Sequence, residues 1–432
     1  MLRWGVLILL LAGAGGFITA AAAGDAADEF AAIDTHALAA PASATGSVSS
    51  LSAYLIKPAR DPSTSLGVAL SRSKGDERDG VRAIFRWITS NIAYDASSRA
   101  ESREPGVVLA RRRAVCYGYA VLFKALASAA GMKAEIIIGH SPKFEQGAAD
   151  ERDDWLNHAW NAVEVAGQWQ LVDCCWGAGY LDERSRFVRA FTPHYLLTAP
   201  EVFVYDHLPQ DPRWQLLHPP ISKDEYVRRV QVRPPFFECG LQLVSHSSAA
   251  IETDRSLAVT IDAPAETLLI ASLYRDRQEL EQGCTFTQRD ATGYVIHARF
   301  PDKGAYVLRI FARRLGTPGN EYAWALDYVV QARSGEDRAA CFPKAYGAFL
   351  THNCRVEGSL SQRLRAGDTA DFCLTVPSAQ DVLLASGGSL VHLSAEGCRF
   401  GGKVPVAPGP VVILAKFPGE STYEGLLQYA VQ

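Results

Sequence analysis

The sequence lacks any long basic run, and no stripe of basic residues alternates with aromatic ones. Its formal net charge of −4 over 432 residues is nearly balanced. The short group Arg111–Arg113 is too small to form a nucleic-acid surface on its own. These absences argue against nucleic acid as a partner. The content of 48% hydrophobic and 21% charged residues is that of an ordinary folded protein.

The cysteines and histidines of the sequence also lack the spacing that is typical of metal sites. Cys174 and Cys175 are adjacent, whereas zinc-binding cysteines are usually separated by about two to four residues. The other candidate ligands, the ten histidines, are scattered along the chain. We therefore expect no metal and no organic cofactor.

The N-terminal segment has the composition of a secretory signal. Arg3 is followed by a largely apolar stretch from Trp4 to about Ala20 and then by small residues. An uncleaved anchor is the alternative, but this stretch is rich in glycine and alanine and marginal for a span of about 20 residues. No cysteine follows it closely, which argues against a lipid anchor. We expect a signal peptide over 1–23, a flexible lead-in over 24–65, and an exported protein (periplasmic or extracellular) without a stable membrane span.

Export changes how the nine cysteines are interpreted. An odd count leaves one over if the rest pair, and Cys116 is the natural unpaired residue. Several cysteines beyond residue 280 favour disulfides in the C-terminal region without indicating their connectivity; these are Cys284, Cys341, Cys354, Cys373 and Cys398.

Residues 158–165 and 168–173 are predicted to form a β-hairpin. The two runs, HAWNAVEV and QWQLVD, are rich in valine, tryptophan and leucine and alternate in part. Ala166 and Gly167 lie between them as a two-residue turn, in which glycine supplies the positive φ that tight hairpins need.

The register of this hairpin brings two polar residues together. With a two-residue turn, Trp160 faces Asp173 and His158 faces Cys175. His158 and Asp173 then lie on one face, roughly 7–8 Å apart at Cα, within reach of a hydrogen bond between their side chains. A loop of odd length would put them on opposite faces.

A second segment has a cysteine at the start of a predicted helix. From Cys116 onward, apolar residues recur at helical spacing, and Gly131 suits the C-terminal cap. The helix dipole and the guanidinium groups of Arg111–Arg113 are expected to favour the thiolate. Taken alone, Cys116 is better interpreted as a small buried residue. The hairpin with His158 and Asp173 reverses that preference, because a thiol, an imidazole and a carboxylate make an activated nucleophile.

Three motifs follow one another along the chain: Cys-x-Gly-Tyr-x-x-Leu-Phe from Cys116, His-Ala-Trp-Asn from His158, and Trp-x-Leu-Val-Asp-x-x-Trp-Gly-Ala-Gly around Asp173. They resemble the transglutaminase-like superfamily. The segments Tyr195–Glu201 and Tyr205–Pro209 extend the resemblance to the kyphoscoliosis-peptidase-like branch. The resemblance covers roughly residues 76–240. It implies a papain-like α+β core and a catalytic triad of Cys116, His158 and Asp173.

The sequence departs from the family pattern at two places. Tyr117 stands where the family often has serine, which leaves the chemistry intact. Cys174 and Cys175 stand where it often has serine and threonine. In the hairpin register Cys175 shares the face of His158, so it could trap Cys116 as a disulfide or sulfenic adduct. We favour the structural alternative, in which both are small strand residues or one pairs with a distant cysteine.

Other segments predict the remaining organisation. A helix is expected from Asp76, because apolar residues such as Val81, Phe85 and Ile88 fall on one face. A short apolar strand is expected over 132–139. The polar residues 141–154 suggest a loop at the rim of a substrate cleft.

Beyond Phe236 the chain changes to short alternating strands separated by turns, which is typical of β-sandwiches. The segments 304–312 and 322–330 are paralleled by 409–417 and 423–431, so we expect two similar modules. The predicted fold class is α+β, a papain-like transglutaminase core followed by two β-sandwich (Ig-like) modules. The predicted domains are the core over 66–235, module 1 over 236–335 and module 2 over 336–432.

Three functions compete on these residues. We favour a cysteine hydrolase (a peptidase or amidase) that acts on protein or peptide amides through a thioester. The first alternative is an acyl transferase that crosslinks protein glutamines with the same triad. The second is a catalytically silent binding or scaffold protein, a fate open to any such fold. The expected partners are a protein or peptide substrate and a protein bound by the C-terminal modules.

The predicted cleavage after Ala23 can be tested by mass. We expect intact-mass analysis of the protein recovered from its native host to give an N-terminus near Gly24. The reason is the positive, apolar and small-residue pattern of residues 1–23. Recovery of a chain that still begins at Met1 would contradict the export prediction.

Overall fold

A computed structural model describes residues 76–99, 103–142, 155–182, 184–280, 283–336, 342–358, 360 and 364–432. The predicted signal peptide, the lead-in and positions 143–154 of the predicted polar loop lie outside these residues. No helix among the described residues is long and apolar enough to cross a membrane.

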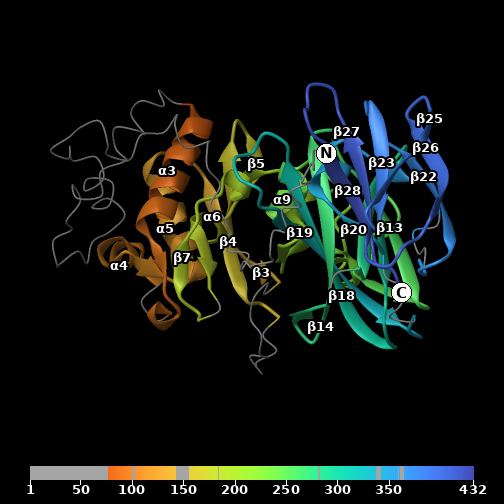
Figure 1. Cartoon of the computed structure of the whole chain (residues 1–432). Coiled ribbons are helices and arrows are strands. Elements are labelled where there is room, and N and C mark those ends of the chain that lie inside the picture. The colour runs from red at the N-terminus through yellow and green to blue at the C-terminus, as the bar shows by residue number, and fades with distance from the viewer. Residues whose placement is uncertain are drawn as a thin grey trace.

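The first unit is an α+β domain whose three longest helices lie on the side away from the β-sandwiches (Figure 1). Its principal helices are α3 (Glu77–Asn91), α4 (Pro105–Arg111), α5 (Cys116–Ala129) and α6 (Cys174–Ala178). Its antiparallel sheet has the strand order β8-β5-β4-β3-β9. These strands are β3 (Ala134–His140), β4 (His158–Val165), β5 (Gln168–Val172), β8 (Leu196–Thr198) and β9 (Leu208–Pro209).

Shorter elements complete this domain. They are the strands β1 (Ala93–Tyr94), β2 (Arg113–Ala114), β6 (Gly179–Leu181) and β7 (Phe187–Arg189), the 3₁₀ turns η2 (Ala96–Ser98), η4 (Pro193–Tyr195) and η5 (Pro212–Gln215), and the helices α7 (Pro200–Phe203) and α8 (Lys223–Arg228). The short helix α9 (Pro234–Glu238) belongs to the core of module 1.

Both long predicted helices are confirmed. The Asp76 carboxylate caps α3 by accepting hydrogen bonds from the N–H groups of Arg78 and Asp79, and the predicted apolar face of α3 is buried. Helix α5 begins at Cys116, and Gly131 follows its end with a φ of 83°. This left-handed conformation favours glycine, as expected for a residue just past a helix C-terminus.

The predicted hairpin is confirmed over most of its length. Val165 pairs with Gln168, and the turn residues Ala166 and Gly167 have φ values of 51° and 75°. Positive φ at both positions is typical of a type I′ turn, whose twist matches the flanking strands.

The end of the second strand was predicted wrongly. Strand β5 stops at Val172, and the Asp173 carboxylate accepts hydrogen bonds from the N–H groups of Cys175 and Trp176, which starts α6. Cys174 and Cys175 are therefore helical residues. The predicted facing of His158 by Cys175 does not occur, because a short aspartate side chain in this position favours a helix start over strand continuation.

Two β-sandwiches follow, as predicted. One sheet of module 1 contains β10 (Gln231–Val232), β12 (Ala250–Thr253), β14 (Thr267–Arg275), β15 (Gln278–Glu279), β18 (Gly304–Arg314) and β19 (Ala323–Ala332). The other has the order β11 (Gln242–Leu243), β13 (Ser256–Asp262), β17 (Gly293–Arg299), β16 (Thr285–Asp290).

Module 2 repeats this design. One sheet has the order β20 (Lys344–Ala345), β28 (Glu424–Tyr429), β27 (Val411–Lys416), β23 (Asp381–Ser386), β24 (Ser389–His392). The other has the order β21 (Arg355–Val356), β22 (Thr369–Thr375), β26 (Arg399–Pro405), β25 (Ser394–Glu396), and the short helix α10 (Gly347–Thr351) precedes β21. The predicted repeat is the pair of antiparallel hairpins β18–β19 and β27–β28.

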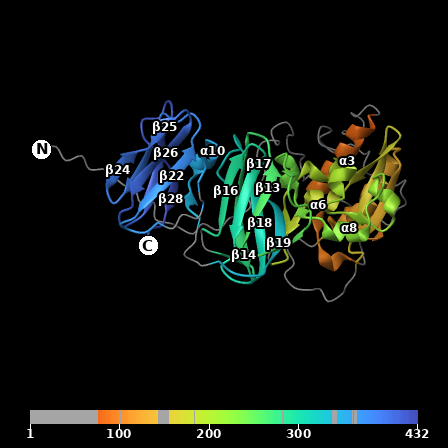
Figure 2. The ribbon, with the colours of Figure 1, turned by 90° about the vertical axis from the view of Figure 1, so that its right-hand side faces the viewer.

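The three units lie in a row, with module 1 in the middle (Figure 2). Tyr205 of the first domain packs against the core of module 1, where its ring contacts that of Phe237. Leu268 and Phe286 of module 1 belong to the apolar cluster that fills module 2, where Phe286 contacts Phe349. Module 1 is thus packed on both neighbours.

The expected C-terminal disulfides are not found among the described thiols. Free thiols occur at Cys116, Cys174, Cys175, Cys239, Cys354, Cys373 and Cys398, and Cys341 lies outside the described residues.

The contact between β3 and β9 can be tested at Gly139. A Cβ atom there would lie 2.8 Å from Pro209 Cα and would also collide with the Leu208 carbonyl oxygen and the Trp160 ring. We expect Gly139→Ala to lower the free energy of unfolding of this domain by about 1–3 kcal/mol, as overpacking does. Urea unfolding followed by tryptophan fluorescence measures it. Gly347→Ala is the control, because an added Cβ there meets nothing within 4 Å. Equal effects of the two substitutions would contradict the packing argument.

Candidate active site

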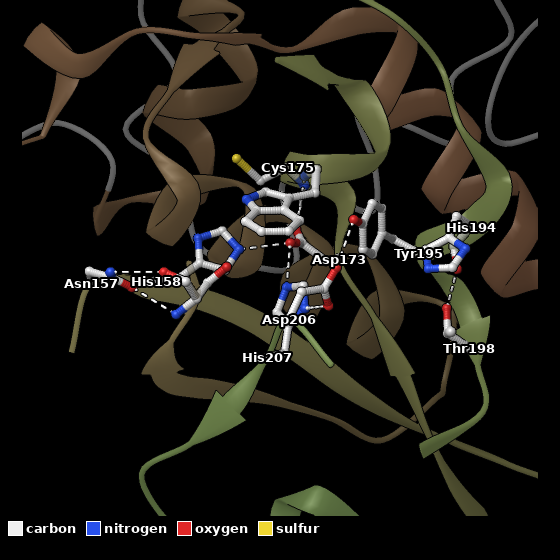
Figure 3. A network of polar contacts seen from close by, with 11 residues as sticks. Asn157, His158, Asp173, Cys175, His194, Tyr195, Thr198, Asp206 and His207 are labelled. Carbon is white, nitrogen blue, oxygen red and sulfur yellow. Dashed lines mark hydrogen bonds and ion pairs between the residues drawn. The ribbon is translucent and has the colours of Figure 1, made fainter. Parts of the chain in front are cut away.

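The three residues of the predicted triad meet in the structure. Cys116 is the first residue of α5, His158 is the first of β4, and Asp173 is the residue between β5 and α6. His158 Nε2 lies 2.7 Å from Asp173 Oδ2, and the side chains of His158 and Cys116 are also hydrogen-bonded. With Nε2 directed at Asp173, the ring nitrogen left for the thiol is Nδ1. Figure 3 shows His158 and Asp173 in this arrangement.

The Asp173 carboxylate accepts hydrogen bonds at both oxygens. Oδ1 accepts from the N–H groups of Cys175 at 2.7 Å and Trp176 at 3.2 Å. Oδ2 lies between two imidazoles, 2.7 Å from His158 Nε2 and 3.1 Å from His207 Nε2. Asp173 is only 1% exposed, so these contacts replace the water that an ionised carboxylate would otherwise bind.

Asparagine side chains hold the strand of His158 in place. Asn161 Nδ2 donates to the carbonyl oxygens of Ala120 in α5, at 3.0 Å, and Glu135 in β3, at 3.1 Å. Asn157, just before the strand, exchanges two hydrogen bonds with the backbone of Ser141. The helix that carries Cys116 is thereby tied to the strand that carries His158.

The electrostatics favour a thiolate–imidazolium pair. Burial alone would raise the pKa of Cys116, but its hydrogen bond to His158, the charge of His158 and the backbone N–H of Ala159 lower it overall. Burial alone would lower the pKa of His158, but the charge and hydrogen bond of Asp173, with the contact to Cys116, raise it to about 10. The pKa of Asp173 is lowered overall against the effect of burial, by His158 first and then by His207.

The predicted contribution of the arginines is not what lowers the pKa of Cys116. Arg112 lies over the ring of Trp87, 4.6 Å from its centroid, and Arg113 pairs with Asp95 at 3.9 Å. The groups that favour the thiolate are His158 and the Ala159 backbone.

Cys174 and Cys175 are core residues in the structure. Both are buried within the apolar cluster of this domain, and burial followed by the nearby charge of Asp173 raises the pKa of each thiol well above its usual value. This agrees with the structural interpretation of the adjacent cysteines.

A second histidine–aspartate pair adjoins the first and was not predicted. His207 Nδ1 lies 2.6 Å from Asp206 Oδ1, and the Tyr195 hydroxyl donates to Asp206 Oδ2 at 2.9 Å (Figure 3). His207, Asp206 and Tyr195 are all buried. The sequence signal was the Asp-His pair within the segment Tyr205–Pro209, to which only a family resemblance was attached.

One group of potential metal ligands occurs among the described residues. It consists of His158, Asp173 and His207, whose ligand atoms lie within 4.8 Å of one another. Hydrogen bonds account for the short distances between these atoms, because Nε2 of His158 and Nε2 of His207 both lie at hydrogen-bonding distance from Asp173 Oδ2. The arrangement therefore needs no ion to explain it.

Two family models match parts of the chain. Residues 64–174 match the transglutaminase-like superfamily, and residues 223–343 match the KY-like, immunoglobulin-like domain.

Curated relatives are similar over about half of the chain. Kyphoscoliosis peptidase of Mus musculus is 31% identical over 259 residues, which are 58% of this chain and 38% of that protein. Hillarin of Drosophila melanogaster is 32% identical over 266 residues, 54% of this chain and 32% of that protein. Lim and transglutaminase domain protein ltd-1 of Caenorhabditis elegans is 33% identical over 220 residues, 46% of this chain and 29% of that protein. The matched region thus spans less than half the length of each of these relatives.

The thiolate of Cys116 can be tested by alkylation. The lowered pKa of Cys116 increases its thiolate fraction over that of an ordinary cysteine at the same pH, and the imidazolium of His158 is lost only as the pH rises through about 10. Burial raises the pKa of Cys239 to about 11 and that of Cys354 to about 12. Because one pKa unit changes the thiolate fraction about tenfold, we expect iodoacetamide to label Cys116 more than about tenfold faster than either.

The matched variant for this experiment is His158→Ala, measured by peptide mapping after brief alkylation. This substitution removes the main cause of the lowered pKa of Cys116. At acidic pH Cys116 should then no longer be alkylated faster than Cys239 and Cys354. Equal labelling of all three thiols in the folded wild-type protein would contradict the ion pair.

Proposed function

We propose that this chain, which carries a transglutaminase-like domain followed by a KY-like, immunoglobulin-like domain, is a cysteine hydrolase that cleaves protein or peptide amides. The observation that carries the proposal is the contact of Cys116 with His158 and of His158 with Asp173 at 2.7 Å. A thiol, an imidazole and a carboxylate in this order form an activated nucleophile.

In the proposed first half-reaction the Cys116 thiolate attacks the carbonyl carbon of an amide. The backbone N–H groups at the start of α5 stabilise the negative oxygen of the tetrahedral intermediate. The His158 imidazolium then donates its Nδ1 proton to the leaving nitrogen. The C–N bond breaks, an amine or ammonia departs, and a thioester remains on Cys116.

In the second half-reaction a water molecule attacks the thioester. Neutral His158 takes one proton from this water, the C–S bond breaks, and the carboxylic acid leaves. The proton on His158 restores the thiolate–imidazolium pair. Asp173 transfers no proton: it orients the ring and stabilises its positive charge.

Acyl transfer is the second candidate, because an amine in place of water would convert the same thioester into a new amide. The name of the murine relative, a peptidase, supports hydrolysis, whereas the transglutaminase-like family model keeps transfer open. Transfer needs a site that positions an amine and excludes water. We favour hydrolysis, because no feature of the sequence indicates such a site.

The remaining parts of the proposal concern place and partners. Export, to the periplasm or the cell exterior, follows from the composition of residues 1–23. The two β-sandwiches are proposed as binding or spacing modules, since their surfaces offer no second triad among the described residues and such domains commonly mediate protein contacts. The second alternative function, a silent scaffold, shares this part of the proposal.

The proposal predicts a graded loss of activity. With a glutamine-bearing peptide, we expect Cys116→Ala to abolish thioester formation and His158→Ala to cost more than about a thousandfold. Asp173→Asn should cost less than His158→Ala, because it keeps an oxygen for the α6 cap and leaves the imidazole in place, while it removes the charge that stabilises the imidazolium. Mass spectrometry of the peptide, with and without an amine donor, measures both products.

Each result of this assay has one meaning. Free acid in the presence of the amine supports hydrolysis, and amine-linked product alone would replace hydrolysis with transfer. Activity unchanged by Cys116→Ala would overturn the mechanism.

A further inference from the structure

The second histidine–aspartate pair, His207 and Asp206, is buried and hydrogen-bonded like the first. His207 is 1% exposed and Asp206 is 3% exposed, so neither side chain exchanges its contacts with bulk water. His207 is hydrogen-bonded through both ring nitrogens, to Asp173 Oδ2 at 3.1 Å and to Asp206 Oδ1 at 2.6 Å. Through His207 the side chains of Asp206 and Tyr195 are connected to the Asp173 carboxylate.

The hydrogen bonds between Asp173, His207 and Asp206 limit where hydrogens can lie on the His207 ring. A carboxylate oxygen only accepts, so each contact between Asp206 or Asp173 and His207 needs a hydrogen on the ring nitrogen. A neutral imidazole carries one such hydrogen, whereas two are needed when both carboxylates are ionised. The second oxygen of Asp206 already accepts from the Tyr195 hydroxyl at 2.9 Å. Both carboxylates thus depend on the His207 ring for one of their hydrogen bonds.

The fold brings His207 to Asp173 through tight backbone packing. Leu208 and Pro209, which follow it, pair with His140 and Gly139 of β3, where the lack of a side chain at Gly139 permits the close approach. On the other side, the ring of Phe203 stacks on the His207 ring with a centroid separation of 4.1 Å.

We propose that His207, held by Asp206 and Tyr195, is a positioning residue for Asp173: its hydrogen bond to Oδ2 orients the Asp173 carboxylate toward His158. This role rests on the proposed chemistry of Cys116. The polar contacts of His207 are with Asp173 and Asp206, and it acts through Asp173.

The charged surroundings agree with this role. The contact with His207 and its positive charge are among the causes that lower the pKa of Asp173, after those of His158. Burial, followed by the charge of Asp206, raises the pKa of Tyr195 well above its usual value, so its hydroxyl remains a donor. The titratable and charged groups around His207 are His158, Asp173, Tyr195, Asp206 and His194, with Arg233 acting on Tyr195.

The test is the rate of Cys116 alkylation by iodoacetamide as a function of pH, measured in the full chain. In His207→Leu the Asp173 carboxylate loses its hydrogen bond from His207, so it is no longer held toward His158 and stabilises the imidazolium less. The thiolate–imidazolium pair of Cys116 and His158 then forms at higher pH. The acid limb of the rate profile should therefore shift by about one unit toward higher pH. His207→Gln, which keeps an N–H donor on a different side chain, should give a smaller shift in the same direction.

Two further variants separate positioning from packing. Asp206→Asn keeps the shape of its side chain but removes the charge that holds His207, so it should also move the acid limb upward. Phe203→Leu loosens the packing on the His207 ring and leaves every polar contact in place, so the limb should stay where it is. If His207→Leu does not fold, His207→Gln and Asp206→Asn decide.

The outcomes distinguish this inference from the proposed function. A wild-type protein without acid-shifted alkylation of Cys116 would overturn both the ion pair and the role of His207. A wild-type acid limb that none of the His207 and Asp206 variants moves would overturn the positioning role alone. An equal shift in Phe203→Leu would also overturn it, since packing would then suffice.

Discussion

The active-site region depends on one buried carboxylate. Asp173 accepts two backbone N–H groups on one oxygen and two imidazoles on the other. An isolated carboxylate in such a dry position would cost several kcal/mol, about the penalty for burying an ion without partners. Every donor must therefore be in place together. The requirement explains why one residue ends β5, starts α6, orients His158 and receives His207.

The same residue links backbone and chemistry. The chain turns from strand to helix at Asp173 because its carboxylate satisfies N–H groups that the first turn of α6 leaves open. Once that oxygen is occupied, only the other oxygen can face the imidazoles. Local capping thus restricts the direction of the carboxylate, and the hairpin register brings His158 to it. A substitution at this position disturbs helix start and ring orientation at once.

The sequence predicts the local parts of the site and misses the distant ones. Cys116 at a helix start and His158 on a hairpin follow from apolar periodicity and a two-residue turn, which act over a few residues. Strand continuation through Cys175 was wrong, because periodicity does not see that an aspartate can cap a helix instead. His207 was missed for a different reason. It lies 34 residues from Asp173, and only the pairing of β9 with β3 brings the two together.

The order of charges explains why the network can be buried at all. With both imidazoles protonated, the groups from Cys116 to Asp206 would alternate in sign: thiolate, imidazolium, carboxylate, imidazolium, carboxylate. Each charge has opposite neighbours, so the attraction between neighbours offsets the loss of water that burial imposes on each. The series ends at the Tyr195 hydroxyl, a neutral donor that closes the last carboxylate without adding a charge. Without the Tyr195 hydroxyl, the Asp206 carboxylate would need another buried cation or contact with solvent. Either change would hold the His207 ring, and through it Asp173, less firmly.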